Sequence, residues 1–255
     1  MASYFSMPSV QGEPIKIVPL YPIGEVKEFA SPPKLVYNNG PLLSSVQVFT
    51  VFWGAAWQQP PLSDYVQSLN SFFDFILTSP LMDQLAEYST SDQHIGYGRR
   101  ISTTIITTSD PGSSVTDNDI QQMLNDAIAN NSVLPQPTPN TLYFVYLPSG
   151  VAVSMGGESS CQSFCGYHND INGQVFYAVM PYPDCSGCTS NLAVFDSLTS
   201  TSSHELCEAV TDPVPGQGWY DQTNGEIGDI CAWQTKQVGN YTVQKEWSNS
   251  ANACI

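Results

Sequence analysis

The sequence predicts a layered domain of the α/β or α+β class, in which helices pack on a mixed β-sheet. Short runs of β-branched and aromatic residues alternate along the chain with longer segments that have the apolar spacing of amphipathic helices. Hydrophobic residues make up 42% of the 255 residues and are spread along the chain instead of being concentrated in one segment. A chain of this length can bury one large core, so we expect a single domain.

The first predicted elements are a strand and the helix that follows it. Residues Val46–Trp53 are mostly β-branched or aromatic and end before Gly54, a pattern that predicts a buried strand. Residues Asp64–Leu77 place apolar side chains at the spacing of one helical face, and Ser79-Pro80 marks the end of this helix.

The later segments repeat this alternation of strand and helix. Thr116 is a suitable N-cap for a helix, and Asp212-Pro213 would end the last helix of the chain. The remaining predicted elements are the strands Ile101–Thr107, Thr141–Leu147 and Val175–Met180, a helix from Thr116 through Ile128, and a final helix over Leu192–Thr211. Helices interleaved with strands are typical of a layered domain.

Residues 1–35 differ in composition from the rest of the chain. This segment has no sustained hydrophobic period and contains Pro8, Pro14, Pro19, Pro22, Pro32 and Pro33. Because proline interrupts helices and central strands, we interpret it as an extended N-terminal arm, or a pro-segment, that wraps a domain formed by residues 36–255.

The composition limits the possible partners. Only 12% of the residues are charged, and 23 carboxylates against 7 Lys or Arg give a net charge of -16. We therefore expect no nucleic acid partner and no anionic membrane partner. Few charges with many small polar residues are typical of an extracellular or wall-associated protein, although Met1–Pro8 lack the basic and apolar regions of a signal peptide.

The seven cysteines allow two interpretations. In the first, they form three disulfides and leave one free thiol, Cys207, which lies inside the last predicted helix as a small apolar residue. In the second, Cys161, Cys165, Cys185 and Cys188 form a four-thiolate zinc site, because their spacing is similar to that of zinc ribbons.

The last predicted helix carries the motif with the clearest chemistry, His204-Glu205-Leu206-Cys207-Glu208. On a helix, His204 and Glu208 project from one face about one turn apart, close enough to bind one ion. Glu205 would lie beside that ion. This arrangement is that of H-E-x-x-H zinc hydrolases, in which the glutamate takes a proton from metal-bound water, with Glu in place of the second histidine.

Other residues would complete such a site. Downstream of the helix, Glu226 is the candidate third metal ligand, and Asp229 would orient His204 from behind. His168, in a predicted turn at Cys165–His168, is an alternative ligand or a donor that stabilises a tetrahedral intermediate. Tyr220 is a second candidate donor, with core packing as its alternative role.

The ligand types favour zinc, with Ca²⁺ or Mn²⁺ as alternatives because the set is rich in carboxylates. The sequence contains no G-x-S-x-G, Walker or dinucleotide-binding motif, so serine hydrolase and nucleotide-binding functions are disfavoured and no organic cofactor is expected.

Three stretches of the chain carry a resemblance to a known family: Tyr37–Leu43 through Val51–Gly54, then Phe164–His168, and then His204–Glu208 with Trp219-Tyr220 and Glu226–Cys231. Together they resemble the plant EXORDIUM, or phosphate-induced, family and its microbial relatives. The similarity covers roughly Leu35 to Cys254. The sequence departs from the family at Cys207, where a small residue is usual, and in the N-terminal arm, which could be an inhibitory segment. The resemblance implies an extracellular protein with a metallopeptidase-like, or zincin-like, helix.

Three hypotheses follow for the domain of residues 36–255. In the first, it is a zinc-dependent hydrolase that cleaves proteins or peptides, with His204, Glu208 and Glu226 as ligands, Glu205 as general base, and His168 or Tyr220 polarising the carbonyl. In the second, it is a non-catalytic extracellular module in which a structural ion supports binding to a cell-wall glycan or a protein. In the third, no metal binds and His204 pairs with Glu226.

Overall fold

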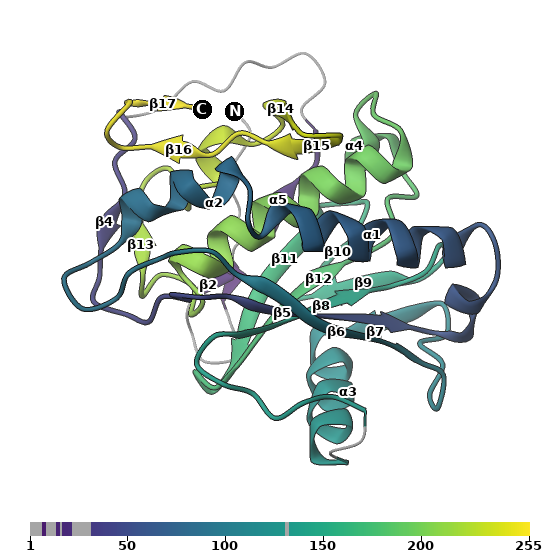
Figure 1. Cartoon of the computed structure of the whole chain (residues 1–255). Helices are drawn as coiled ribbons and strands as arrows, with labels where there is room; N and C mark the ends of the chain where they lie inside the picture. Colours follow the sequence, from purple (N-terminus) through teal and green to yellow (C-terminus); the bar gives the residue numbers. More distant parts are fainter. Residues whose placement is uncertain (1–6, 9–13, 16, 22–31, 131–132) are drawn as a thin grey trace.

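A six-stranded mixed sheet forms the centre of the protein (Figure 1). The computed structural model describes residues 7–8, 14–15, 17–21, 32–130 and 133–255. Four of the strands are parallel to one another, while β11 runs antiparallel to β12, and β3 runs antiparallel to β11. The strands lie in the order β3 (Ile17–Pro19), β11 (Phe164–Ile171), β12 (Val175–Met180), β8 (Thr141–Tyr146), β5 (Gln47–Trp53) and β6 (Arg99–Ile106).

Helices cover both faces of this sheet (Figure 1). On one face lie α1 (Leu62–Ile76), α2 (Pro80–Leu85) and α5 (Val194–Thr211), and on the other lies α3 (Asp117–Ala129). Side chains alternate between the two faces: Phe144 joins the core under α1 and α5, whereas its neighbours Tyr143 and Val145 join the core under α3. The predicted mixed α/β architecture is therefore confirmed in its class and its layering of helices on a sheet.

Smaller elements connect and cover these layers. They are β1 (Met7–Pro8) paired with β2 (Pro14–Ile15); β7 (Ser114–Thr116), β9 (Ala152–Met155) and β10 (Glu158–Ser159) in one small sheet; β4 (Val36–Tyr37) with β13 (Trp219–Tyr220); β14 (Thr235–Val238) with β15 (Tyr241–Gln244); β16 (Trp247–Ser248) with β17 (Ala253–Cys254); the short helix α4 (Ser186–Thr189); and the 3-10 turns η1 (Ala55–Gln58), η2 (Ala86–Tyr88) and η3 (Asp229–Cys231).

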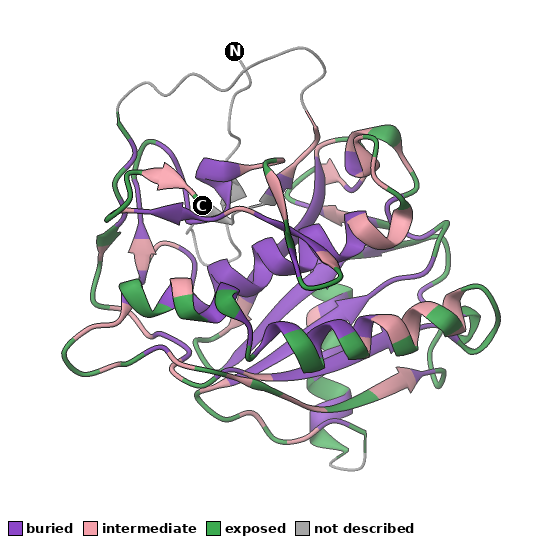
Figure 2. Ribbon diagram, turned by 45° about the horizontal axis from the view of Figure 1, so that its top comes forward, coloured by how far each residue is buried: buried purple, intermediate pink, exposed green. Residues whose placement is uncertain are grey.

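Helix α5 is enclosed by other elements, and every residue from Ser197 to Thr211 is buried (Figure 2). It packs between β11 and β12 on one side and the β14–β15 hairpin on the other. Its hydroxyl groups find partners there: Thr199 Oγ1 donates to the Thr242 carbonyl oxygen at 2.7 Å, and Ser203 Oγ accepts from the Gln244 amide at 2.9 Å. These hydroxyl groups of the helix can be buried because they are hydrogen-bonded.

The main strands and helices lie close to the predicted segments, but the Cys165–His168 stretch does not form the predicted turn. It belongs to β11, which pairs with both β12 and β3. This pairing on both sides keeps the chain extended, and Gly166 allows α5 to approach closely: a Cβ atom at this position would lie 2.7 Å from Thr201 Cγ2. The turn prediction was therefore wrong.

The cysteines form three disulfides, Cys161–Cys185, Cys165–Cys188 and Cys231–Cys254, and leave Cys207 as a free, buried thiol. The disulfide interpretation is confirmed, and the four-thiolate zinc site is wrong because its four sulfurs are paired with one another. Three disulfides fit a secreted or extracellular protein. Within the described ranges, the longest apolar helix falls short of what a membrane crossing requires.

Part of the N-terminal arm joins the main sheet. Strand β3 lies at the sheet edge, with Val18 opposite Gly166 of β11. The Trp233 indole N–H donates to the Pro19 carbonyl oxygen at 2.9 Å, and the Tyr21 amide donates to the Gly187 carbonyl oxygen at 2.7 Å. Most of the arm before Pro32 lies outside the described residues.

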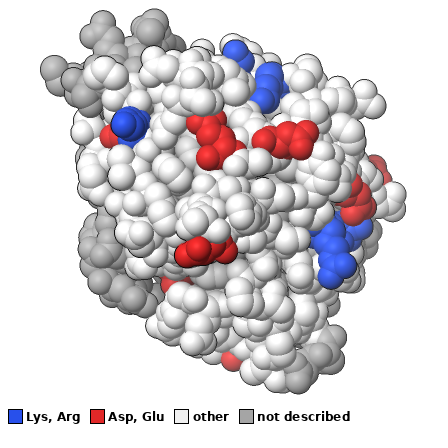
Figure 3. Space-filling view, turned by 60° about the vertical axis from the view of Figure 1, so that its left-hand side comes forward, with Lys and Arg blue, Asp and Glu red and all other residues white. Residues whose placement is uncertain are grey.

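Much of the negative charge lies inside the fold. In the described ranges, eight acidic residues are buried: Asp117, Glu205, Glu208, Asp212, Asp221, Glu226, Asp229 and Glu246. The face shown in Figure 3 accordingly carries a few scattered acidic and basic groups on a mostly uncharged surface. The net charge of -16 therefore overstates the negative charge at the surface.

Asp212 ends α5 and fixes the turn that follows. Its carboxylate accepts hydrogen bonds from the amides of Gly216, Gln217 and Gly218 at 2.6, 3.0 and 2.5 Å. We predict that Asp212→Ala lowers the free energy of unfolding by about 3 kcal/mol, because three amides lose a charged acceptor. Asp212→Asn, which keeps one carbonyl oxygen, should lose less. Urea denaturation measures both, and an alanine variant as stable as the wild type would contradict this role.

Candidate metal centre

Helix α5 brings His204, Glu205 and Glu208 into the interior, where each has an exposed fraction of 0%. His204 Nε2 lies 2.9 Å from Glu208 Oε1, one turn along the helix, as the four-residue spacing predicts. The pair has the distance of an ion pair, but neither imidazole nitrogen has a partner in hydrogen-bonding geometry. Two ligands facing one cation would be arranged in this way.

His168 enters the same interior from β11. Its Nδ1 atom lies 3.1 Å from Glu205 Oε2 and 3.5 Å from Glu208 Oε2. On the other side of the ring, Nε2 lies 3.1 Å from the Asp212 carbonyl oxygen and 3.5 Å from Glu226 Oε1. The sheet and the helix thus meet at this imidazole, which is itself 0% exposed.

The loop after β13 supplies two further carboxylates, Glu226 and Asp229, both buried. The Asp229 amide donates to Glu208 Oε1 at 3.1 Å, and the Glu226 amide donates to Asp229 Oδ2 at 3.1 Å. Gly228 lies against the His204 ring, because a Cβ there would stand 2.8 Å from ring atoms. Gln244 Nε2 donates to the Gly228 carbonyl oxygen at 2.9 Å and fixes this approach.

Two groups of potential ligands result, and Glu208 belongs to both. One group is His168, Glu208 and Glu226, and the other is His204, Glu208 and Asp229; in each, the ligand atoms lie within 4.8 Å of one another. The expected ligands His204, Glu208 and Glu226 are therefore all in one buried region, but Glu226 lies nearer to His168 and Asp229 is grouped with His204. Tyr220 is in β13, buried, and pairs with Val36 of β4.

The carboxylates of this region are buried without full compensation. Both oxygens of Glu226, Oε1 of Glu205 and Oε2 of Glu208 have no hydrogen-bond partner. Among the described residues, the ion pairs of these three glutamates are all with the two histidines. Because a buried charge is costly unless it is paired or coordinates a metal, the region requires additional positive charge.

The pKa shifts also indicate that negative charge exceeds positive charge in this region. Burial raises the pKa of Glu205 to about 7, against the opposing hydrogen bond from His168. Burial also raises the pKa of Glu208, but the positive charges of His204 and His168 outweigh it and lower that pKa to about 2. Burial and the Glu208 charge hold the pKa of Glu226 well above its usual range. Protons or a cation must supply the missing positive charge.

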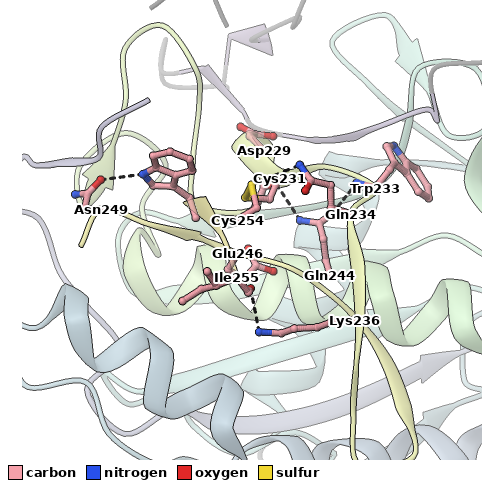
Figure 4. The surroundings of a disulfide bond; sticks show 12 residues. Asp229, Cys231, Trp233, Gln234, Lys236, Gln244, Glu246, Asn249, Cys254 and Ile255 are labelled. Carbon is pink, nitrogen blue, oxygen red and sulfur yellow. Dashed lines mark hydrogen bonds between the residues drawn. A yellow bond between two sulfur atoms is a disulfide. The ribbon is translucent and has the colours of Figure 1, made fainter. Parts of the chain in front are cut away.

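Glu246 is a further buried carboxylate that carries no sequence motif. It precedes β16, has an exposed fraction of 0%, and neither carboxylate oxygen has a hydrogen-bond partner. Burial first and then the charge of Glu246 raise the pKa of the Cys207 thiol, so these groups are neighbours under the C-terminal hairpins. Figure 4 shows Glu246 below the Cys231–Cys254 disulfide, near Lys236, whose Nζ donates to the Ile255 carbonyl oxygen at 3.0 Å.

No protein-family model matches the chain, and the comparison with curated proteins finds no match.

The contact between Gly228 and His204 provides a test of this site. We predict that Gly228→Ala displaces the imidazole and weakens Zn²⁺ binding about 10- to 100-fold, the usual effect of disturbing a residue that orients a ligand. Isothermal titration of metal-free protein measures the affinity. Gly96→Ala is the matched control, because its new Cβ would meet only the Ser44 carbonyl oxygen at 3.9 Å. Equal affinities in the two variants would show that His204 does not bind the ion.

Proposed function

We propose that the protein is a metal-dependent hydrolase, with a protein or peptide as substrate and zinc as the metal. The observation that carries this proposal is Glu226, a fully buried carboxylate whose two oxygens receive no hydrogen bond, beside His168, Glu208 and the Asp212 carboxylate. These residue types and their orphaned atoms fit a divalent cation of the zinc class. His204, Glu208 and Glu226 would hold the ion, with His168 and Asp229 close enough to serve as ligands or to orient them.

A divalent cation bound there would polarise a substrate carbonyl and acidify a water molecule. Glu205 would act as general base, because its pKa of about 7 lies near neutral pH, where a carboxylate can both accept and release a proton. It would hold the proton on its carboxylate and pass it to the departing amine. His168 Nδ1 lies 3.1 Å from Glu205 Oε2, so His168 would either orient that carboxylate or donate a hydrogen bond to the substrate carbonyl oxygen. Tyr220 is the second candidate for the donor role.

The fold supports this function by analogy. A mixed sheet with the motif-bearing helix on one face is compatible with zincin-like layering. The resemblance to the EXORDIUM family supports a metallopeptidase-like role for that helix. Three disulfides support an extracellular protein.

The catalytic role of Glu205 has a direct test. We predict that Glu205→Gln retains the metal but hydrolyses fluorescently labelled casein at least about 100-fold more slowly, because the amide cannot accept the proton. Glu158→Gln, a change of the same type in β10, should leave the rate unaltered. Wild-type activity in Glu205→Gln would rule out this mechanism.

Complete burial of the centre favours a second candidate, an extracellular module with a structural ion that binds a wall glycan or a protein. All five residues His168, His204, Glu205, Glu208 and Glu226 have an exposed fraction of 0%, which suits an ion that holds layers together. In the third hypothesis no metal binds, and less than a tenth of an ion per chain by elemental analysis would support it. Its expected pair is replaced in the structure, because Glu226 lies beside His168 and it is Glu208 that lies beside His204.

Removal of the metal separates the first two candidates. For a structural ion, we predict that chelation lowers Tm by about 5–10 °C, because the protein loses a ligand that binds the folded state alone. We also predict that the protein does not hydrolyse casein either before or after chelation. Calorimetry with and without chelator, beside the casein assay, measures both quantities. Loss of casein hydrolysis on chelation, restored by Zn²⁺, would instead establish the hydrolase.

A further inference from the structure

We propose that the centre binds two divalent cations, bridged by the Glu208 carboxylate. This inference rests on the proposed function in one respect, that the buried centre holds metal. It goes beyond it in the number of ions and in the assignment of their ligands. His168 and Glu226 form the ligands of one ion, His204 and Asp229 form those of the other, and Glu208 belongs to both.

The orientation of Glu208 is the first observation. Its Oε1 atom faces His204 Nε2 at 2.9 Å, and its Oε2 atom faces His168 Nδ1 at 3.5 Å. The two oxygens of one carboxylate are thus directed at two imidazoles that come from different elements, β11 and α5. Carboxylates that bridge two metals present one oxygen to each ion, and such ions lie about 3.5–4 Å apart.

Each imidazole also has a carboxylate of its own. Glu226 is grouped with His168 and Glu208, and Asp229 is grouped with His204 and Glu208; in each group one potential ligand atom per residue lies within 4.8 Å of the others. The result is two sets of the same composition, one histidine and one carboxylate each, on the two sides of Glu208.

Unpartnered atoms occur on both sides. Both oxygens of Glu226 and Oε2 of Glu208 lack a hydrogen-bond partner on the His168 side, and both nitrogens of His204 lack one on the other side. Buried polar atoms normally find partners, so a single ion on either side would leave the orphaned atoms of the opposite side uncompensated.

The buried carboxylates also exceed the charge of one ion. Glu205, Glu208, Glu226 and Asp229 are buried together with two imidazoles, which are neutral when they bind metal, and the buried carboxylates of Asp212 and Glu246 interact with the same groups. One divalent cation cannot balance this set when its carboxylates are ionised, so a second cation lowers the cost of burying them.

Zinc stoichiometry tests the proposal. Metal-free full-length protein is dialysed against Zn²⁺, and bound metal per chain is measured by elemental analysis; we expect two ions. Glu226→Gln and Asp229→Asn, which each remove a ligand from one side, should each retain one ion. His94→Gln is the matched control, because His94 is exposed and is the remaining histidine at which adventitious Zn²⁺ could bind; it should retain two.

The outcomes separate the two proposals. A single ion in the wild type overturns the bridged pair but leaves the proposed function intact, whereas no ion overturns both. Two ions in the wild type and one in His94→Gln would assign the second ion to the surface and also overturn the pair. Because the wild-type and His94→Gln counts are decisive alone, a folding defect in Glu226→Gln or Asp229→Asn does not affect the test.

Discussion

Burial of ionised groups around Glu208 is the constraint on which the rest of the structure depends. Moving a carboxylate out of water costs several kcal/mol even after relaxation, so a fold that buries several of them must supply opposite charge at close range. Here two imidazoles approach Glu208 from two different elements, one from β11 and one from α5 itself. The layers on both sides of α5 hold these groups together and exclude water from them.

Close approach of these layers depends on residues that lack bulk. Helix α5 is rich in Ser and Thr, which are not strong helix formers, and its stability comes from packing on all sides instead of from propensity. Gly166 lets α5 lie directly on β11, and Gly228 lets the acidic loop lie on the His204 ring. A side chain at either glycine would push apart the groups that the site brings together, which is why two small residues matter as much as the ligands.

Local patterns account for what the sequence predicted. Regular apolar spacing predicts the strands and helices because that spacing is a property of residues close together in the sequence. The four-residue spacing of His204 and Glu208 predicts their contact for the same reason. Strand β11 lacks such a pattern: Gly166, His168 and Asn169 are buried by pairing with β3 and β12 and by contact with α5, not by hydrophobic alternation. Glu246 was missed because only the tertiary fold brings it under the hairpins.

Hydrogen bonds of the acidic loop position part of the candidate ligand set. The Asp229 amide fixes Glu208 Oε1, the Glu226 amide fixes Asp229 Oδ2, and Gln244 fixes the Gly228 carbonyl between them. These bonds use main-chain groups of the acidic loop and position the carboxylates of Glu208 and Asp229. A cation bound there would therefore need to order fewer ligand side chains. The fold therefore carries the energetic cost of concentrating negative charge, and the free energy of metal binding would offset that cost.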